Sequence, residues 1–233
     1  MIDVNAILSK AKQIGASDAH FIPGIKPTLR INRDLVELDE YENISKEDIL
    51  DVYDYFLKGN LDKDKFFREY KVLDTSAVFE DIRLRVNISY SSGLPVITTR
   101  LIRNELPTYE ELGVPDIVRR MTHQQQGLIL VTGKTNSGKS TTLNALINYI
   151  NENENKKILT LESPVEYKHK CKKSIIVQKE VGVGGDVPAY SIGTKNSLRE
   201  DCDILIIGEI RDRETMDAAI ETAESGHLVI GTL

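Results

Sequence analysis

The sequence is short of cysteine and lacks any long apolar run. Its 233 residues include only two cysteines, Cys171 and Cys202, and these do not form a C-x-x-C pair. Their scarcity argues against a zinc site and a disulfide scaffold, and it fits a reducing, cytosolic setting. No apolar stretch approaches the roughly 20 residues that cross a bilayer, and the first residues do not form a secretory signal. We therefore expect any membrane association to go through a partner protein.

The sequence also lacks an excess of basic charge, with 30 lysines and arginines against 36 aspartates and glutamates. The formal net charge is −6, whereas a dedicated duplex-binding protein usually carries a lysine- and arginine-rich face. The best candidate for a local basic patch is residues 168–173 (KHKCKK), and such a run usually marks a solvated edge or turn. We expect no direct binding of nucleic acid. The lack of an LSGGQ-like segment also disfavours an ABC-type transporter subunit.

The pattern of residues 1–104 predicts a small α+β domain with an antiparallel sheet. Apolar residues recur at helical spacing over 3–14 and 47–57, whereas residues 82–89 alternate between apolar and polar side chains. A partner strand is expected over 95–102, across a turn at 91–93.

From residue 105 onward the pattern becomes that of an α/β domain. Four apolar runs alternate with helical stretches, which predicts a mostly parallel sheet with functional sites at the carboxyl ends of its strands. The sequence stops at Leu233, at the end of the last of these runs. We expect the domain to be incomplete there and the protein to be longer. The four runs are residues 127–132, 158–161, 204–208 and 228–232.

The most informative segment is residues 133–141 (GKTNSGKST), which fits the phosphate-binding pattern G-x-x-x-x-G-K-[ST]. An apolar run precedes it and a helical pattern follows it, so backbone N–H groups and the helix dipole would face a phosphate. Lys139 would reach the β- and γ-phosphates, and the Ser140 hydroxyl would bind Mg²⁺. The candidate nucleotide-binding residues of this loop are Gly133, Thr135, Asn136, Ser137, Gly138, Lys139, Ser140 and Thr141.

Acidic residues follow two of the apolar runs. Glu209 ends the run 203–209 (DILIIGE), and it is the candidate carboxylate that holds Mg²⁺ or polarises the attacking water. Glu162 and Glu166 follow the run 158–161, where a phosphate site and a simple surface turn are equally compatible with the spacing. Two arginines near Glu209 could stabilise a transferring phosphoryl group or form surface ion pairs. They are Arg199 and Arg211.

Together these motifs resemble the pilus-retraction ATPases of twitching motility, within the secretion ATPase superfamily, over nearly the whole chain. The similarity is most specific where GEIRD and ESGHL occur together. The segments that carry it are 15–20 (GASDAH), 27–32 (PTLRIN), 82–87 (IRLRVN), 162–166 (ESPVE, the Asp box), 208–212 (GEIRD, Walker B) and 224–233 (ESGHLVIGTL, the start of the His box).

The resemblance implies a hexameric ring of subunits, each with a PAS-like N-terminal domain and a RecA-like core, with ATP and Mg²⁺ bound between them. It implies that Glu209 is the catalytic carboxylate and, with Ser140, a metal ligand, and that Glu162 and Glu166 support Mg²⁺ and the water. His227 would lie near the γ-phosphate. Such a motor works in the cytoplasm at the inner face of the membrane, on an inner-membrane protein of the pilus base. The candidate phosphate-sensing arginines are Arg83, Arg85, Arg100, Arg199 and Arg211.

Several residues depart from that family's pattern. Ser163 stands in place of an aspartate, Lys195 in place of an arginine, and Cys202 in place of a proline. Lysine cannot form the bidentate fork of arginine, so Lys195 would make a weaker phosphate contact. An alternative hypothesis is therefore that the chain is a catalytically weak, nucleotide-binding paralogue that regulates a partner motor. A pilus-assembly or secretion ATPase is a further alternative. The lack of a four-cysteine motif and of a long N-terminal extension favours the retraction type.

Overall fold

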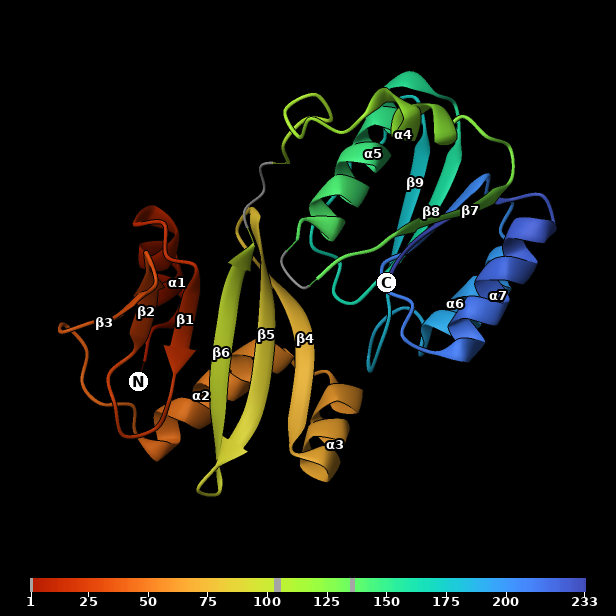
Figure 1. Cartoon of the computed structure of the whole chain (residues 1–233). Helices are drawn as coiled ribbons and strands as arrows, with labels where there is room; N and C mark the ends of the chain where they lie inside the picture. Colours follow the sequence, from red (N-terminus) through yellow and green to blue (C-terminus); the bar gives the residue numbers. More distant parts are fainter. Residues whose placement is uncertain (1, 103–105, 135–136) are drawn as a thin grey trace. The chain divides into compact units, whose positions relative to one another are not determined.

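The computed structural model describes residues 2–102, 106–134 and 137–233 (Figure 1). The chain divides into two compact units, Met1–Asn104 and Glu105–Leu233. No helix in these described ranges combines the length and the apolar character needed to cross a membrane.

The first unit contains an antiparallel sheet in the order β3-β2-β1-β6-β5-β4. β5 forms a hairpin with β6, and the turn between them has Ser92 and Gly93 at positive φ, as expected of a two-residue hairpin loop. Its strands are β1 (Asp18–Phe21), β2 (Thr28–Ile31), β3 (Asp34–Glu37), β4 (Val72–Phe79), β5 (Ile82–Ser91) and β6 (Leu94–Ile102).

Three helices pack with one face of this sheet in a single core: α1 (Val4–Gln13), α2 (Lys46–Leu57) and α3 (Leu61–Tyr70). Side chains fix where the helices begin. Asp3 accepts a hydrogen bond from the backbone of Ala6, and Ser45 forms a capping box with Asp48. The core-facing residues of β5 are Leu84, Val86 and Ile88, so its arginines lie on the opposite, polar face.

The second unit is built on a parallel sheet in the order β7-β11-β10-β8-β9. This confirms the predicted RecA-like α/β fold with a parallel sheet. The strands are β7 (Gly127–Val131), β8 (Lys157–Glu162), β9 (Ile175–Glu180), β10 (Ile204–Ile207) and β11 (Leu228–Thr232).

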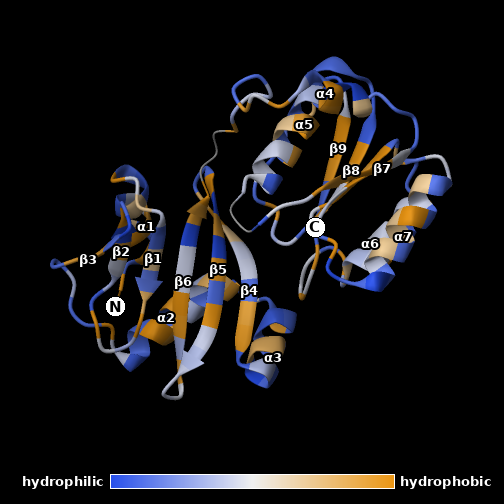
Figure 2. Cartoon of the chain, in the orientation of Figure 1, coloured by the Kyte–Doolittle hydropathy of each residue, from blue (hydrophilic) through white to orange (hydrophobic). Residues whose placement is uncertain are grey.

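Helices cover both faces of the parallel sheet (Figure 1). α5 (Lys139–Asn153) packs on one face against a core that includes Ile158 and Ile206. α6 (Tyr190–Ser197) and α7 (Arg213–Glu224) cover the other, where Leu159 and Leu161 are buried. Because neighbouring residues of each strand point to opposite faces, strands buried on both sides are apolar along their length, as Figure 2 shows. A short helix, α4 (Asp116–Met121), precedes β7.

Several elements of the fold were not assigned a range from the sequence, β4 and α4 among them. The others are β1, α3 and β9, each of which is short or carries many polar residues. The expected core face of α1 also needs one correction. Ile14 lies outside the helix as its C-cap residue and is 42% exposed, so it does not join the core.

Candidate functional site

The loop between β7 and α5 carries the phosphate-binding motif. α5 begins at Lys139, and its N-cap residue is Gly138, which has φ +95° and offers no side chain to cap the helix. Gly138 therefore does not cap the backbone N–H groups of the first turn, which lie at the positive end of the helix dipole. Ser140 is exposed and Thr141 half-buried in this first turn. The predicted binding residues Thr135 and Asn136 lie outside the described residues.

The described part of the loop is tightly folded. A Cβ added at Gly133 would come within 2.6 Å of the Ser137 hydroxyl oxygen, so glycine at this position lets the Ser137 side chain lie close to the loop backbone. The backbone N–H of Ser137 donates to the carbonyl of Lys134 at 3.1 Å. The ammonium of Lys139 donates to the carbonyl oxygens of Gly133 at 2.6 Å and of Lys134 at 3.2 Å. Its charge is thus held over the loop.

The candidate acidic residues lie at the same edge of the sheet as this loop. Val131 pairs with Thr232, and Leu161 pairs with Ile207, so the carboxyl ends of β7, β11, β10 and β8 are aligned. Glu162 is the last residue of β8, and Glu209 follows β10 after one glycine. The N–H of that glycine, Gly208, donates to the carbonyl of Leu161 at 2.8 Å. The sheet therefore brings Glu162 and Glu209 to neighbouring strand ends.

Glu162 is buried and has fixed hydrogen-bond donors. Its Oε1 accepts from the Thr160 hydroxyl at 2.7 Å and from the Gln178 amide at 3.1 Å. Glu166 follows in an irregular segment beyond the cis peptide bond between Ser163 and Pro164, and it is half-buried.

Glu209 is more accessible. Its carboxylate forms an ion pair with Arg211, and the two side chains are 37% and 75% exposed. Tyr190, at the start of α6, lies close to the acidic residues. Burial raises the pKa of the Tyr190 hydroxyl, and the charges of Glu209 and Glu162 raise it further. The hydroxyl thus stays protonated beside two carboxylates.

Two predicted site residues lie elsewhere in the unit. The carbonyl of His227 accepts from the N–H of Gly127 at 3.1 Å, at the start of β7. Because β11 has five residues that each advance the chain by about 3.3 Å, His227 is about 16 Å from the loop edge. β11 therefore separates His227 from the phosphate-binding loop of its own chain, and the role of His227 near a γ-phosphate stays a prediction.

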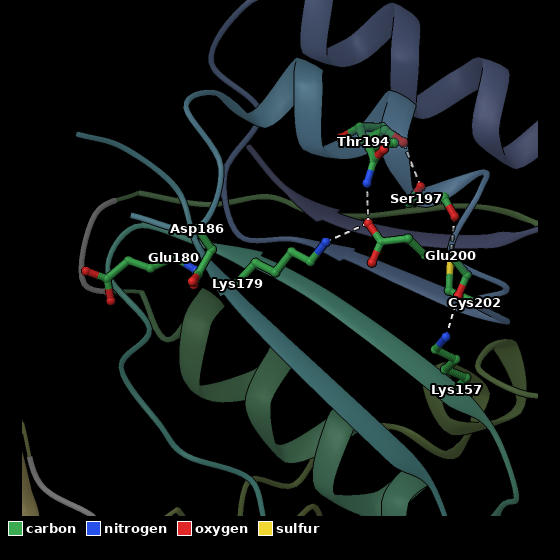
Figure 3. A network of polar contacts seen from close by, with 9 residues as sticks. Lys157, Lys179, Glu180, Asp186, Thr194, Ser197, Glu200 and Cys202 are labelled. Carbon is green, nitrogen blue, oxygen red and sulfur yellow. Dashed lines mark hydrogen bonds and ion pairs between the residues drawn. The ribbon is translucent and has the colours of Figure 1, made fainter. Parts of the chain in front are cut away.

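Arg199 is also at the far edge of the sheet, in the exposed turn between α6 and β10. The next residue, Glu200, belongs to the polar network in Figure 3. Its carboxylate pairs with Lys179 at 2.6 Å, and its carbonyl accepts from Lys157, the first residue of β8. Arg199 thus begins a segment that is anchored, through Glu200, to both β8 and β9.

The remaining candidate arginines belong to the first unit, on the polar face of its sheet. Arg83 is buried and donates to the Ser76 hydroxyl at 3.1 Å. Arg85 and Arg100 are directly opposite each other on β5 and β6. Arg100 pairs with the buried carboxylate of Asp18 at 3.0 Å.

Sequence reasoning missed the residues that support Glu162. Thr160 and Gln178 come from neighbouring strands, and His169 lies in the basic segment 168–173, which was interpreted only as a solvated edge. No local pattern marks Gln178 and His169, because Glu162 and Asn144, which their side chains contact, are distant in the sequence. Among the described residues, no group of three or more His, Cys, Asp or Glu side chains is placed to hold a metal ion.

A parallel sheet with helices on both faces, a glycine-rich loop leading into a helix, and acidic residues at the same edge define a P-loop NTPase fold with a RecA-like core. The pattern of the type II/IV secretion system protein family matches residues 77–233. The chain belongs to this family.

Individual relatives extend the similarity to the first unit. The chain is 36% identical over 233 residues to the type IV pilus retraction ATPase PilT of Pseudomonas aeruginosa, covering all of this chain and 66% of PilT. It is 34% identical to the type IV pilus ATPase PilU of the same organism, covering 94% of this chain and 56% of PilU. A twitching motility protein of Neisseria gonorrhoeae is 36% identical over 89% of this chain and 54% of its own length. The chain thus spans between about half and two thirds of these relatives.

Solved structures show the same similarity. A crystal structure of the pilus retraction motor PilT with bound ADP superposes with a TM-score of 0.92 at 37% identity, over all of this chain and 67% of that one. The Legionella pneumophila ATPase DotB superposes with a TM-score of 0.86 at 29% identity, over 97% of this chain and 64% of DotB.

Proposed function

We propose that this chain is the nucleotide-binding part of an Mg²⁺-dependent ATP-hydrolysing motor that powers retraction of type IV pili. One observation carries the proposal: the phosphate-binding loop, Glu162 and Glu209 lie at one edge of the sheet. The similarity to PilT over the whole chain supports retraction as the work performed.

The loop fits a nucleotide phosphate in shape and charge. Gly133 lets the Ser137 side chain lie close to the loop backbone, and the Lys139 ammonium lies over the carbonyl groups of Gly133 and Lys134. The first turn of α5 presents backbone N–H groups and the helix dipole to an anion. In this proposal the described residues Gly133, Ser137, Gly138, Lys139, Ser140 and Thr141 bind the phosphates, together with Thr135 and Asn136.

The acidic edge fits the metal and the water. Mg²⁺ supplies charge neutralisation of the phosphates, and it needs few protein ligands because it keeps several of its waters. We assign the Ser140 hydroxyl and Glu209 as its ligands and Glu209 as the carboxylate that polarises the water. Glu162 and Glu166 support that arrangement from the end of β8.

The arginines are assigned by charge and position. Arg211 pairs with Glu209 and is the candidate in the same unit. Arg83, Arg85 and Arg100 are the candidates on the first unit, which we interpret as a PAS-like domain. Arg199 and His227 lie at the edge of the sheet opposite the phosphate-binding loop of their own chain. Any contact that they make with a nucleotide would therefore be with the nucleotide bound by another subunit. Such contacts need a ring, which we propose to be a hexamer.

We place this ring in the cytoplasm, at the inner face of the membrane, on an inner-membrane protein of the pilus base. The relatives named for pilus retraction and twitching motility support this placement. We expect no nucleic-acid substrate.

The test is phosphate release from Mg-ATP by the natural full-length protein, with mass measured by light scattering. Two variants separate binding from chemistry. Lys139→Ala should abolish binding of a fluorescent ATP analogue, whereas Glu209→Gln should keep binding and lose about 10²- to 10⁴-fold in turnover. Turnover confined to a ring-sized species supports the motor. ATP binding without turnover in the wild type would refute it and favour a regulatory paralogue.

A further inference from the structure

A hydrogen-bonded network fixes the buried carboxylate of Glu162. Thr160 on β8 and Gln178 on β9 are directly opposite each other in the sheet. They lie on the face that packs against α5, because Ile158 and Ile176, two residues before them, belong to the core beneath that helix. Both side chains donate to the same oxygen, Oε1 of Glu162, at 2.7 Å and 3.1 Å. Two donors on one oxygen set the rotation of the carboxylate.

Gln178 also holds the irregular segment that follows Glu162. Its Nε2 donates to the carbonyl of Tyr167 at 2.7 Å, in addition to Glu162, and its Oε1 accepts from the backbone N–H of His169 at 2.9 Å. The network thus requires two donors and one acceptor in a single planar group, which a glutamine supplies. A glutamate at this position would lose both donors and add a negative charge beside Glu162.

The ring of His169 carries the network onto α5. Its Nε2 is 2.8 Å from Oδ1 of Asn144, and the Nδ2 of Asn144 donates to the carbonyl of Ser140 at 2.9 Å. Because Oδ1 can only accept, Nε2 of His169 must carry a proton and donate. Burial lowers the pKa of His169 to about 4, so the ring is neutral near pH 7 and keeps this single donor.

A continuous path therefore connects the first turn of α5 with the carboxylate at the end of β8. It runs from Ser140 through Asn144, His169 and Gln178 to Glu162. The donor–acceptor distance of each hydrogen bond along this path is between 2.8 Å and 3.1 Å. Hydrogen bonds of this length restrict the relative movement of the groups they join.

We propose that Gln178 and His169 are positioning residues that hold the Glu162 carboxylate in register with the first turn of the phosphate-binding helix. The inference rests on the proposed function, because it assumes that Glu162 supports the metal and the water. Neither residue would touch nucleotide, so their loss should affect turnover and leave nucleotide binding almost intact.

The experiment measures kcat and the affinity for a fluorescent ATP analogue in the natural full-length protein. Gln178→Leu removes the amide at similar volume, and we expect kcat to fall by about 10- to 100-fold, as for other residues that orient a ligand group. His169→Phe should lower kcat less, because the backbone N–H that reaches Gln178 remains. His169→Gln should restore turnover, since its amide can donate to Asn144.

The matched control is His123→Phe. His123 lies at the carboxyl end of α5, and its Nδ1 is 2.9 Å from the carboxylate of Glu154. We expect the kcat of the His123→Phe variant to equal that of the wild type. Wild-type protein without turnover would refute the proposed function. If the wild type turns over ATP, two results would overturn this inference alone. One is a kcat in Gln178→Leu equal to that of the wild type, and the other is an equal loss of nucleotide affinity and kcat in that variant. If Gln178→Leu fails to fold by circular dichroism, equal kcat in His169→Phe and His169→Gln overturns it.

Discussion

Gly208 controls the spacing between the two acidic strand ends, and replacing it with alanine should disturb both stability and turnover. A Cβ added at Gly208 would lie 2.9 Å from the carbonyl oxygen of Leu161 and 3.3 Å from the Cα of Glu162. Both atoms belong to the backbone of β8, which is hydrogen-bonded on both sides by β10 and β9. Neither atom can rotate away, so the two strand ends must separate.

The size of the effect follows from this geometry. Non-bonded atoms prefer separations of about 3.5 Å, so the strands must part by roughly 0.6 Å. This lengthens the 2.8 Å hydrogen bond from Gly208 to Leu161. Overpacking of this kind costs about 1–3 kcal/mol of unfolding free energy. Because Glu209 is the next residue, we also expect about a tenfold loss of kcat, given that a shift of about 1 Å can cost about 100-fold.

Gly193→Ala is the matched control. A Cβ at Gly193, on α6, would also meet Leu161, but at the end of its side chain, with Cδ2 at 2.8 Å. A side chain can move without displacing a strand end, so this variant should lose stability and keep its kcat. Urea unfolding and phosphate release measure the two quantities. Wild-type stability in Gly208→Ala, or an equal loss of kcat in both variants, would refute the reasoning.

Three further predictions concern the segment beside α5 and the two cysteines. Burial holds the pKa of His169 at about 4, below its ordinary value of 6.5, so the unfolded state binds the proton more readily. Unfolding free energy should therefore fall by up to about 3 kcal/mol as the pH drops from about 6.5 to about 4. His169→Gln should flatten that dependence in urea titrations, and an unchanged slope would contradict it. Asn151 is buried, donates to the carbonyl of Lys170 at 2.8 Å and accepts from the N–H of Lys172 at 2.9 Å. Asn151→Ala should cost about 1–3 kcal/mol and make trypsin cleave residues 168–173 sooner, a change that sodium dodecyl sulfate gels would detect. Burial raises the pKa of Cys202, whereas Cys171 is exposed. A thiol reagent should therefore label Cys171 quickly and Cys202 slowly in the native protein, and Cys171→Ser should abolish the fast phase of labelling.

The parts of the fold that were predicted correctly have local signals. The apolar runs at 127–132, 158–161, 204–208 and 228–232 correspond to β7, β8, β10 and β11. The three inner strands, β8, β10 and β11, are buried on both faces and are therefore apolar along their length, whereas β7 is a half-buried edge strand that is nevertheless apolar. Residues 82–89 alternate because one face of β5 packs in the apolar core, whereas the other face carries polar side chains that are mostly half-buried. The unpredicted strand β9 is at the edge of its sheet and is mostly half-buried, so its sequence mixes apolar and polar residues.

The position of a site residue was predictable only where a strand end determined it. Glu162 and Glu209 each follow a recognisable strand, and parallel strands place their carboxyl ends together. The position of His227 could not be derived from its motif, because a shared motif does not say at which end of a strand its members lie. The pairing of Leu228 with Gly127 puts His227 at the far edge.

The sequence by itself determined the class of fold and the phosphate-binding loop, because both depend on periodicity and on glycine, lysine and serine at short spacing. Only the tertiary structure decided what holds Glu162 in place. Its support comes from Thr160, Gln178 and, through His169, from Asn144. These residues meet because strand register and helix packing bring separate segments together. Neither register nor packing leaves a local pattern in the chain.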